Sequence, residues 1–240
     1  MKGVILAGGT GSRMSDAVGE LPPHARNKHF LEVNGVSLVN RAVQQMRDVG
    51  LTEIAVVTNG EMVTEMIKHV GKDVTVLPQR SPLGIAHALM CAKTWCGTAD
   101  SVAVLLADNL FLKMPRDEVT GFRLNPNGAA CFYALHRNAQ NFAIALFVQG
   151  GGNAVSHIVE KPDVPAGAQY PVVTGFYLYD DTVWERIRTL KFSARNELEI
   201  TELNNTYAHE VSLVAHELKT PWMDACVSPG SLHQASLMLR

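Results

Sequence analysis

Short apolar runs alternate with amphipathic stretches in the first half of the chain. Apolar runs rich in β-branched residues, which are typical of buried strands, lie at residues 3–7, 53–58, 74–77 and 101–107. Apolar residues at helical spacing lie between them, at residues 38–49, 61–70 and 85–95. Strands that alternate with helices in this way predict a mostly parallel sheet covered on both faces. The fold class is therefore α/β, with a Rossmann-like central sheet flanked by helices.

The second half has a different pattern, with four strand candidates and little helix between them. These candidates lie at residues 128–135, 142–149, 155–159 and 173–179. The glycines of residues 150–152 predict a hairpin turn. Two helices, a strand and a last helix are predicted at residues 181–190, 198–209, 211–218 and from 231. This half therefore predicts a small antiparallel extension, and we expect residues 1–240 to form a single domain.

Composition and charge exclude several classes of protein. The 240 residues are 47% hydrophobic and 18% charged, which is typical of a globular chain. The net charge of −2 gives no basic surface for nucleic acid or for an anionic membrane. No apolar run reaches the length of a membrane span, and the first run ends at glycines, unlike a signal peptide. Four cysteines without metal-binding spacing are typical of a reducing compartment, so we expect a cytoplasmic protein.

A glycine-rich segment, Gly8-Gly9-Thr10-Gly11-Ser12-Arg13, follows the first predicted strand directly. Glycines allow positive φ and close approach to a ligand, and successive backbone N–H groups in such a loop converge on an anion. Arg13 adds a planar cation to the same segment. The sequence therefore favours a phosphate site here over a plain turn between a strand and a helix.

Polar residues also follow the other predicted parallel strands. Gln79 and Asp108 each come at the end of a strand, as the glycine segment does. Because ligands bind beyond the carboxyl ends of the strands in such sheets, we expect these residues to lie along one edge. Arg13 and Lys28 would neutralise a triphosphate there, and Asp108 would hold a divalent ion. Asp224, between apolar neighbours, is either a second acid of this site or a hydrogen-bonded aspartate before the last helix.

Two common nucleotide sites do not fit the glycine segment. A dinucleotide site needs an acid at the end of the second strand, and that strand ends Val57-Thr58-Asn59. A P-loop needs Lys followed by Ser or Thr directly after its glycines, and this chain has Ser12-Arg13-Met14. The sequence therefore argues against a dehydrogenase and against a Walker-type ATPase.

Motifs along nearly the whole chain resemble those of the sugar-1-phosphate nucleotidylyltransferases, most closely the glucose-1-phosphate thymidylyltransferase type in a short form. The first is Leu6-Ala7-Gly8-Gly9-x-Gly11-x-Arg13-Met14. The others, in family order, are QRSPLGIAHA at 79–88, LADN at 106–109, VEKP at 159–162, VTGFYLYD at 173–180, SARNELEITELN at 193–204 and WMD at 222–224. The resemblance implies the nucleotide-diphospho-sugar transferase fold, with a nucleotide-binding half at residues 1–125 and an acceptor-binding half at 126–240.

The resemblance also implies a set of residues for the nucleoside triphosphate. The residues that would wrap the nucleotide are Leu6, Ala7, Gly8, Gly9, Thr10 and Gly11. Arg13 would contact its β and γ phosphates, and Lys28 would face the α-phosphate. Gln79 and Gly84 would contact the edge of a base, expected to be a pyrimidine. Asp108 and Asp224 would hold Mg²⁺, with Asp108 also counted among the nucleotide-binding residues.

On the acceptor side, the resemblance implies that Glu160 binds sugar hydroxyls and that Lys161 and Arg195 bind the sugar phosphate. Asn109, Thr174 and Gly175 complete that set. The reaction implied is in-line attack of a sugar 1-phosphate oxygen on the α-phosphorus, which yields an NDP-sugar and pyrophosphate. Such transfer depends on positioning and charge neutralisation, so no nucleophilic side chain is required. The implied catalytic residues are Arg13, Lys28 and Lys161.

The chain departs from the family pattern at several positions. The segment between Arg13 and Lys28 is longer than usual, and Asn27 replaces the proline expected before the lysine. Ala143 replaces a glycine that lets the backbone approach the sugar, and Ala225-Cys226 replaces Thr-Gly after the metal-binding aspartate. No hexapeptide-repeat segment follows, so we expect no second, acyl-transfer activity.

These departures leave two alternatives open. The crowded position at Ala143 motivates a cytidylyltransferase that acts on a non-sugar phosphate or phosphonate. A catalytically silent nucleotide-binding regulatory protein is the alternative of another class, although the retained Arg13, Lys28, Asp108 and Asp224 argue against it. The sequence does not decide whether the protein forms a homo-oligomer.

Overall fold

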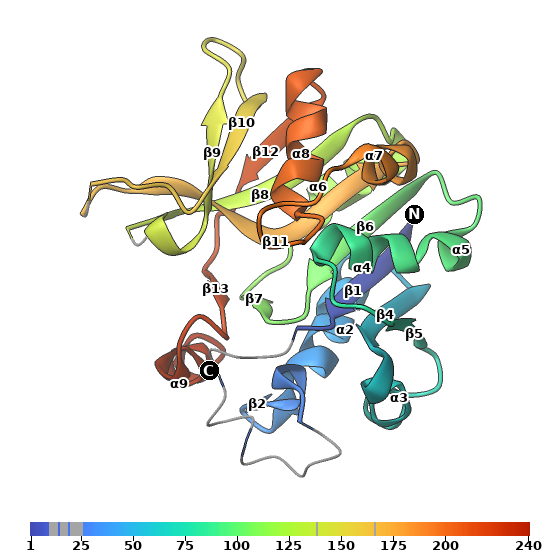
Figure 1. Ribbon diagram of the computed structural model, residues 1–240. Coiled ribbons are helices and arrows are strands. Elements are labelled where there is room, and N and C mark those ends of the chain that lie inside the picture. Colours follow the sequence, from blue (N-terminus) through green and yellow to red (C-terminus); the bar gives the residue numbers. More distant parts are fainter. Residues whose placement is uncertain (10–13, 15–18, 20–25, 138, 166) are drawn as a thin grey trace.

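A computed structural model describes residues 1–9, 14, 19, 26–137, 139–165 and 167–240 (Figure 1). Four strands of the first half form the parallel part of a large sheet, in the order β6, β1, β4, β5. They span Ser101–Leu106, Lys2–Ala7, Ile54–Asn59 and Thr75–Gln79. In their register Leu6 pairs with both Val57 and Leu106. The carboxyl ends therefore meet at one edge, and the predicted parallel sheet is confirmed.

The second half extends this sheet with antiparallel strands. The long strand β11 pairs antiparallel with β6 and with β8, and β9 and β10 form a hairpin. Strand β12 lies parallel to β8. These strands span Tyr170–Asp180, Ala129–His136, Ala143–Phe147, Val155–Glu160 and Leu213–Glu217. Gly150 and Gly152 have positive φ, which a tight hairpin connection requires, so the predicted turn is confirmed.

Helices cover both faces of the sheet. Alternate residues of β1 point to opposite sides, with Val4 and Leu6 in one hydrophobic cluster and Ile5 and Ala7 in the other. Helices α2 and α3 cover one face, and α4, α7 and α8 cover the other (Figure 1). The helices α2 to α9 span Leu38–Asp48, Val63–Val70, Ile85–Cys91, Lys93–Cys96, Arg116–Leu124, Val183–Thr189, Ile200–His209 and Pro229–Met238.

Several short elements differ from the sequence prediction. The helix expected at 85–95 is divided at Ala92 into α4 and α5. Helix α6 was not predicted because Val119 is its one buried residue, which leaves no apolar periodicity to recognise. The two-stranded sheet of β7 (Asn109–Phe111) and β13 (Trp222–Asp224) was also missed. Three residues are too few for an alternating pattern, and this small sheet carries part of the site.

The segment around Lys28 has its own local structure. Lys28–Phe30 forms a 3₁₀ helix, and the strands β2 (Glu32–Val33) and β3 (Val36–Ser37) form a hairpin after it. Asn34 and Gly35 both have positive φ, as the tight turn between these two strands requires. Among the residues that the structure describes, no helix has the length and apolar character needed to cross a membrane.

Candidate active site

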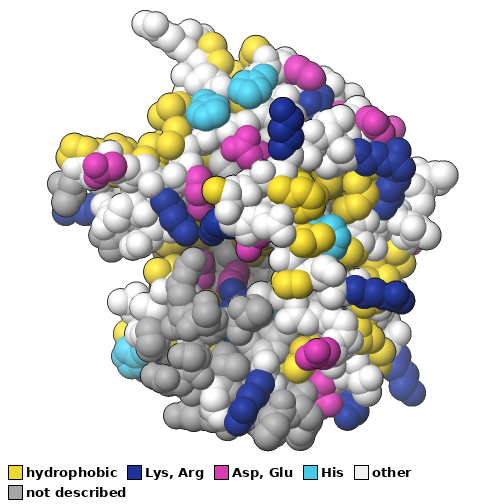
Figure 2. All heavy atoms as spheres, in the orientation of Figure 1, with side chains coloured by type: hydrophobic (Ala, Val, Ile, Leu, Met, Phe, Trp, Pro, Cys, Tyr) yellow, Lys and Arg dark blue, Asp and Glu magenta, His cyan; other side chains and the backbone are white. Residues whose placement is uncertain are grey.

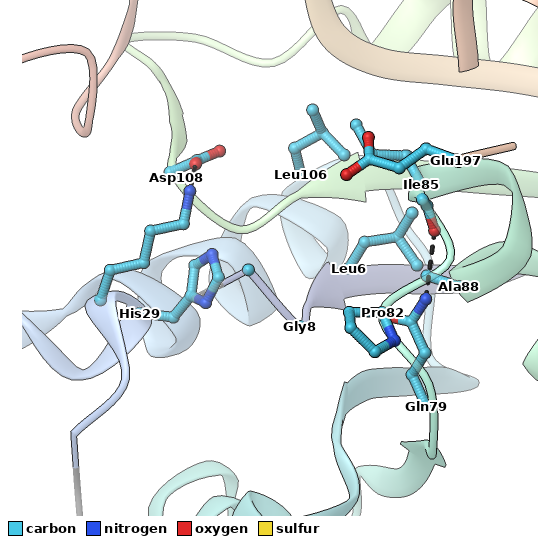
Figure 3. Close-up of a pocket in the computed structure, with 13 residues that line it drawn as sticks. Leu6, Gly8, His29, Gln79, Pro82, Ile85, Ala88, Leu106, Asp108 and Glu197 are labelled. Carbon is cyan, nitrogen blue, oxygen red and sulfur yellow. Dashed lines mark hydrogen bonds and ion pairs between the residues drawn. The ribbon is translucent and has the colours of Figure 1, made fainter. Parts of the chain in front are cut away.

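The carboxyl edge of the parallel strands opens into a pocket of about 280 Å³. Gly8 follows β1, Gln79 ends β5 and Asp108 follows β6, and all three line this pocket. Its remaining lining residues are Leu6, Gly9, Lys28, His29, Pro82, Gly84, Ile85, Ala88, Leu106 and Glu197 (Figure 3). The convergence predicted from the strand ends is therefore present.

Lys28 and Asp108 form an ion pair at one end of the pocket. The side chain of Lys28 is 19% exposed and that of Asp108 is 10% exposed. Burial disfavours both charges, but each charge outweighs this effect on its partner. The pKa of Asp108 therefore lies below its usual range, and the pKa of Lys28 lies above its usual range. Both groups are ionised at neutral pH.

Asn27 and His29 hold the short helix that carries Lys28. The Asn27 side chain is buried, donates to the Ala7 carbonyl (3.2 Å) and accepts from the His29 N–H (2.9 Å). The His29 ring nitrogen Nδ1 lies 2.7 Å from the same Asn27 oxygen. Burial and the neighbouring Lys28 charge lower the pKa of His29 to about 3, so its ring is neutral at pH 7. Through Asn27, the Lys28 turn is tied to the end of β1.

Gln79 lies at the opposite end of the pocket from Asp108 (Figure 3). Its Nε2 donates to the Gly84 carbonyl at 3.1 Å and lies 3.1 Å from Nδ1 of His87. Gly84 has a φ of +99°, and a Cβ there would meet the Leu198 carbonyl at 2.5 Å. Only glycine fits this position, because the backbone has a positive φ and passes close to Leu198. The carbonyl of Gly84 accepts the hydrogen bond from Gln79.

Asn109 connects Asp108 to the small β7–β13 sheet. Its Nδ2 donates to Asp108 at 3.0 Å, and its Oδ1 accepts from the Gly175 N–H at 2.8 Å and from the Trp222 ring at 2.7 Å. A Cβ at Gly175 would lie 2.6 Å from the Asn109 amide, so a side chain there would displace it. Asn109 and Gly175 therefore fix the wall of the site beside Asp108.

Asp224 lies next to Asp108 through the same small sheet. It pairs with Asn109 between β13 and β7, and the following N–H, of Ala225, donates to the Asp108 carbonyl at 2.8 Å. One Asp224 oxygen also accepts from the Cys226 N–H at 2.8 Å. Asp224 is therefore a hydrogen-bonded aspartate that lies beside Asp108, and its role as a second acid of the site stays a prediction.

Two adjacent carboxylates fit a Mg²⁺ ion that takes its remaining ligands from phosphates and water. Asp108 and Asp224 supply oxygen donors of this kind, and Asp224 contributes with Asp108 to the raised pKa of Lys28. Among the described residues there is no group of three His, Cys, Asp or Glu side chains that would enclose a metal by themselves. Asp108 and Asp224 would therefore hold such an ion only together with ligands from a substrate or from water.

A second pocket, of about 230 Å³, adjoins the first. The two share Ile85, Leu106 and Glu197, so they form one cleft. Residues of the second pocket that the sequence assigned to the acceptor or the metal are Asn109, Glu160, Lys161, Thr174, Gly175, Arg195 and Asp224. Figure 2 shows acidic and basic side chains gathered in the hollow on this face of the molecule.

Two charged residues of the second pocket, Glu160 and Arg195, have defined side-chain partners. Thr201 donates to Glu160 at 2.9 Å, and Arg195 binds both oxygens of Glu199, the closer at 2.9 Å. Lys161 has a φ of +43°, an uncommon backbone conformation for a residue with a side chain. Such conformations cluster at ligand sites, where the surrounding structure holds them.

Some predicted site residues lie elsewhere or cannot be placed. Thr10, Gly11 and Arg13 lie outside the described residues. Ala7 is buried beneath the pocket, where Asn27 and Thr58 both donate to its carbonyl. Thr174 lines the second pocket, but its hydroxyl donates to the Phe132 carbonyl at 2.9 Å.

Sequence reasoning missed three residues of the cleft. The sequence analysis assigned no role to the histidines, but His29 lines the first pocket and His87 contacts Gln79. For His87 a signal existed, because a residue three positions after Gly84 lies on the same helix face. Glu197, which borders both pockets, had no such signal.

Comparison with known proteins decides the family. A family model described as nucleotidyl transferase matches residues 2–238. The chain belongs to this nucleotidyl transferase family. The nucleotidyltransferase Agl11 of low-salt glycan biosynthesis in Haloferax volcanii is 33% identical over 232 residues, which cover 93% of this chain and 62% of Agl11. A glucose-1-phosphate thymidylyltransferase of Neisseria meningitidis is 31% identical over 247 aligned positions, with 98% of this chain and 81% of that protein covered.

Solved structures of this nucleotidyl transferase fold agree with the architecture. A Bacillus anthracis protein provisionally assigned as a glucose-1-phosphate thymidylyltransferase, solved with a sucrose, is 33% identical. It superposes with a TM-score of 0.85 over 100% of this chain and 95% of its own. A UDP-glucose pyrophosphorylase complexed with UDP-glucose, 19% identical, has a TM-score of 0.80 over 98% of this chain and 97% of its own, and shares the fold. The predicted family, fold class and enzyme class are confirmed.

Proposed function

We propose that this nucleotidyl transferase condenses a pyrimidine nucleoside triphosphate with a sugar 1-phosphate, in the presence of Mg²⁺, to give an NDP-sugar and pyrophosphate. The observation that carries the proposal is the position of the Lys28–Asp108 pair within one continuous cleft. Asp108 lines the pocket that we assign to the nucleotide, and its neighbours Asn109 and Asp224 line the pocket that we assign to the acceptor. The reacting phosphates would therefore meet beside a fixed cation and two carboxylates.

The nucleotide pocket has the parts that a triphosphate and a flat base require. Gly8 and Gly9 provide backbone without side chains beside Lys28, and a Cβ at Gly9 would approach the Lys28 side chain at 3.1 Å. We place the α-phosphate beside the Lys28 ammonium, where negative charge develops during transfer. Arg13, with Thr10 and Gly11, would bind the outer phosphates, as the family motif implies.

Asp108 and Asp224 would hold Mg²⁺ in this arrangement. The ion would supply charge neutralisation to the triphosphate oxygens when bound. The chain's own contribution is to keep both carboxylates ionised and adjacent, through Lys28, Asn109 and the pairing of β7 with β13.

In the acceptor pocket, Lys161 and Arg195 would bind the sugar phosphate and Glu160 the hydroxyls. An oxygen of the sugar phosphate would form a bond to the α-phosphorus as the bond to the leaving pyrophosphate breaks. The wall made by Asn109, Thr174 and Gly175 would hold the acceptor in line. We propose that residues 1–240 act as one domain, with nucleotide binding in 1–125 and acceptor binding in 126–240, and that the protein acts in the cytoplasm.

A matrix of nucleoside triphosphates against sugar 1-phosphates, non-sugar phosphates and phosphonates tests this proposal, with pyrophosphate release as the readout. We expect release with a pyrimidine triphosphate and a sugar 1-phosphate, and loss of release when magnesium is chelated. Tight nucleotide binding without any release across the matrix would instead support the regulatory alternative.

One observation favours a second candidate, a cytidylyltransferase for a non-sugar phosphate or phosphonate. Ala143 lines the acceptor pocket and pairs with Glu160 across the β9–β10 hairpin. Its methyl group occupies space where a sugar would approach the backbone. If the acceptor is a sugar, Ala143→Gly lowers its KM; if the acceptor is smaller, the substitution leaves KM unchanged or raises it.

A further inference from the structure

The amide of Gln79 has one orientation in the nucleotide pocket. Its Nε2 lies 3.1 Å from the Gly84 carbonyl oxygen and 3.1 Å from Nδ1 of His87. A carbonyl oxygen can only accept, so the amide nitrogen and not the oxygen must face Gly84. The second hydrogen of that nitrogen then points to His87, whose Nδ1 accepts it while Nε2 carries the ring proton. Burial lowers the pKa of His87, which favours this neutral form.

The Gly84 carbonyl is itself held in place. The Leu198 N–H donates to the Leu83 carbonyl at 2.7 Å, and the Ala86 N–H donates to the Leu198 carbonyl at 3.0 Å. Gly84 lies between these two bonds, and a Cβ there would meet the Leu198 backbone at 2.5 Å. The acceptor that orients Gln79 is therefore part of a fixed backbone ladder.

This arrangement leaves the Gln79 oxygen as the group presented to a ligand. No hydrogen bond within the described part of the chain reaches Oε1. Every buried side-chain polar atom of the described residues has a hydrogen-bond partner. Since Oε1 of Gln79 has none, it is not buried and is accessible from the pocket. It lies 2.8 Å from the place where a Cβ on Gly8 would be, on the side of the phosphate-binding glycines.

Most of the other side chains at this end of the pocket are apolar. They are those of Leu6, Pro82, Ile85, Ala88 and Leu106, with Glu197 beside Ile85 as the charged exception (Figure 3). A flat base between the apolar walls meets the oxygen of Gln79 as a fixed acceptor. A base that offers an N–H group at that point gains a hydrogen bond, whereas a base with a lone pair there faces another lone pair.

We infer that His87 is a positioning residue for base selection. Together with the Gly84 carbonyl, His87 fixes the orientation of the Gln79 amide. The pocket then selects uracil or thymine, which carry an N–H at N3, over cytosine, which carries a lone pair at N3. The inference rests on the proposed function, because it takes Gln79 as the residue that contacts the base. It concerns binding of the triphosphate alone and does not depend on the acceptor.

Calorimetric titration of the purified protein with UTP, dTTP and CTP in magnesium buffer tests the inference. The wild-type protein binds UTP and dTTP about 10- to 100-fold more tightly than CTP, the range expected when one buried hydrogen bond is replaced by an unsatisfied acceptor. His87→Leu removes the Nδ1 acceptor and brings the ratio to within about threefold, mainly by weakening UTP and dTTP. His87→Gln restores an acceptor oxygen toward Gln79 and retains the preference.

His209→Leu, a substitution of an exposed histidine at the end of α8, is the matched control and leaves the ratio unchanged. With an acceptor identified, the same His87→Leu effect falls on the KM of the triphosphate and leaves kcat within about twofold of wild type. Equal binding of UTP and CTP by the wild type, or an unchanged ratio in His87→Leu, overturns the inference. The proposed function fails separately, if triphosphates bind with this preference but no acceptor releases pyrophosphate.

Discussion

Lys28 and Asp108 are 80 positions apart in the sequence, and their side chains form an ion pair in the first pocket, beside Asn109, which lines the second. Lys28 reaches this point from a 3₁₀ turn beside β1, and Asp108 from the end of the neighbouring strand β6. Asn109 holds the second Asp108 oxygen, and Asp224 follows across the β7–β13 pair. The site thus places one cation and two anions within a framework set by three separate elements.

Removing the Asp108 charge separates its catalytic role from its structural one. Asp108→Asn keeps the shape of the side chain but loses the carboxylate needed for Mg²⁺, so we expect turnover to fall by about 10³-fold or more. Lys28 loses its anion, but it is partly exposed, so the loss of stability stays below the roughly 3–5 kcal/mol typical of a fully buried pair. Pyrophosphate release and circular dichroism measure the two effects. An unchanged rate with an intact fold would remove the metal role of Asp108.

His29 predicts a pH dependence of stability below neutral pH. Its pKa is about 3 in the folded protein and about 6.5 in the unfolded chain. Between these values the unfolded chain binds a proton that the folded protein does not, so the free energy of unfolding falls by about 1.4 kcal/mol for each pH unit as the pH decreases. His29→Gln removes this dependence. Urea unfolding at pH 7.5 and pH 5 measures it, and an equally steep loss in the variant would contradict the prediction.

Much of this fold could be predicted from the sequence because its central strands are apolar on both faces. Val4 to Ala7 read as an uninterrupted buried run, and the structure buries each of them. Ligands bind beyond the carboxyl ends of such strands, so the sequence alone could predict that Gly8, Gln79 and Asp108 lie together at one edge of the sheet. The turn at Gly150 was an equally local signal.

The parts that could not be predicted depend on contacts between distant segments. Trp222 and Asn109 belong to strands of three residues, whose pairing leaves no periodic pattern. For His29 no sequence feature separates a surface histidine from one inside a pocket, and for His87 the spacing from Gly84 indicates a helix face but not the contact with Gln79. Their roles follow from partners, Asn27 and Gln79, whose side-chain directions are set by the folded backbone.

Asn205 supports the acceptor pocket from outside it. This buried side chain on α8 accepts from the Ile158 N–H at 2.8 Å and donates to the Ile158 carbonyl at 3.0 Å, completing the outer edge of β10. Asn205→Ala leaves two buried backbone groups without partners, so we expect the free energy of unfolding to fall by about 2–4 kcal/mol. Glu160 lies two residues further along the same strand, so KM for the acceptor rises as well.

Ser156→Ala is the control for Asn205, since its exposed hydroxyl donates to the Leu146 carbonyl on the same hairpin. An exposed hydrogen bond of this kind contributes less than about 0.5 kcal/mol. Equal effects of the two substitutions in urea unfolding would show that the Asn205 bonds do not stabilise the strand edge.

Asn27 stands where the family pattern has proline, and the structure predicts that proline cannot simply be restored. Asn27 has a φ of −135°, whereas proline requires about −65°. Its side chain also makes the bonds to Ala7 and His29 that fix the Lys28 turn. We expect Asn27→Ala to lower kcat about 10- to 100-fold, with little change in KM for the acceptor, because Lys28 is misplaced at the α-phosphate. Asn27→Pro removes the same bonds and strains the backbone, so it lowers kcat and the melting temperature further than alanine does. A proline variant as active and as stable as wild type would show that the turn reaches its catalytic position without the asparagine.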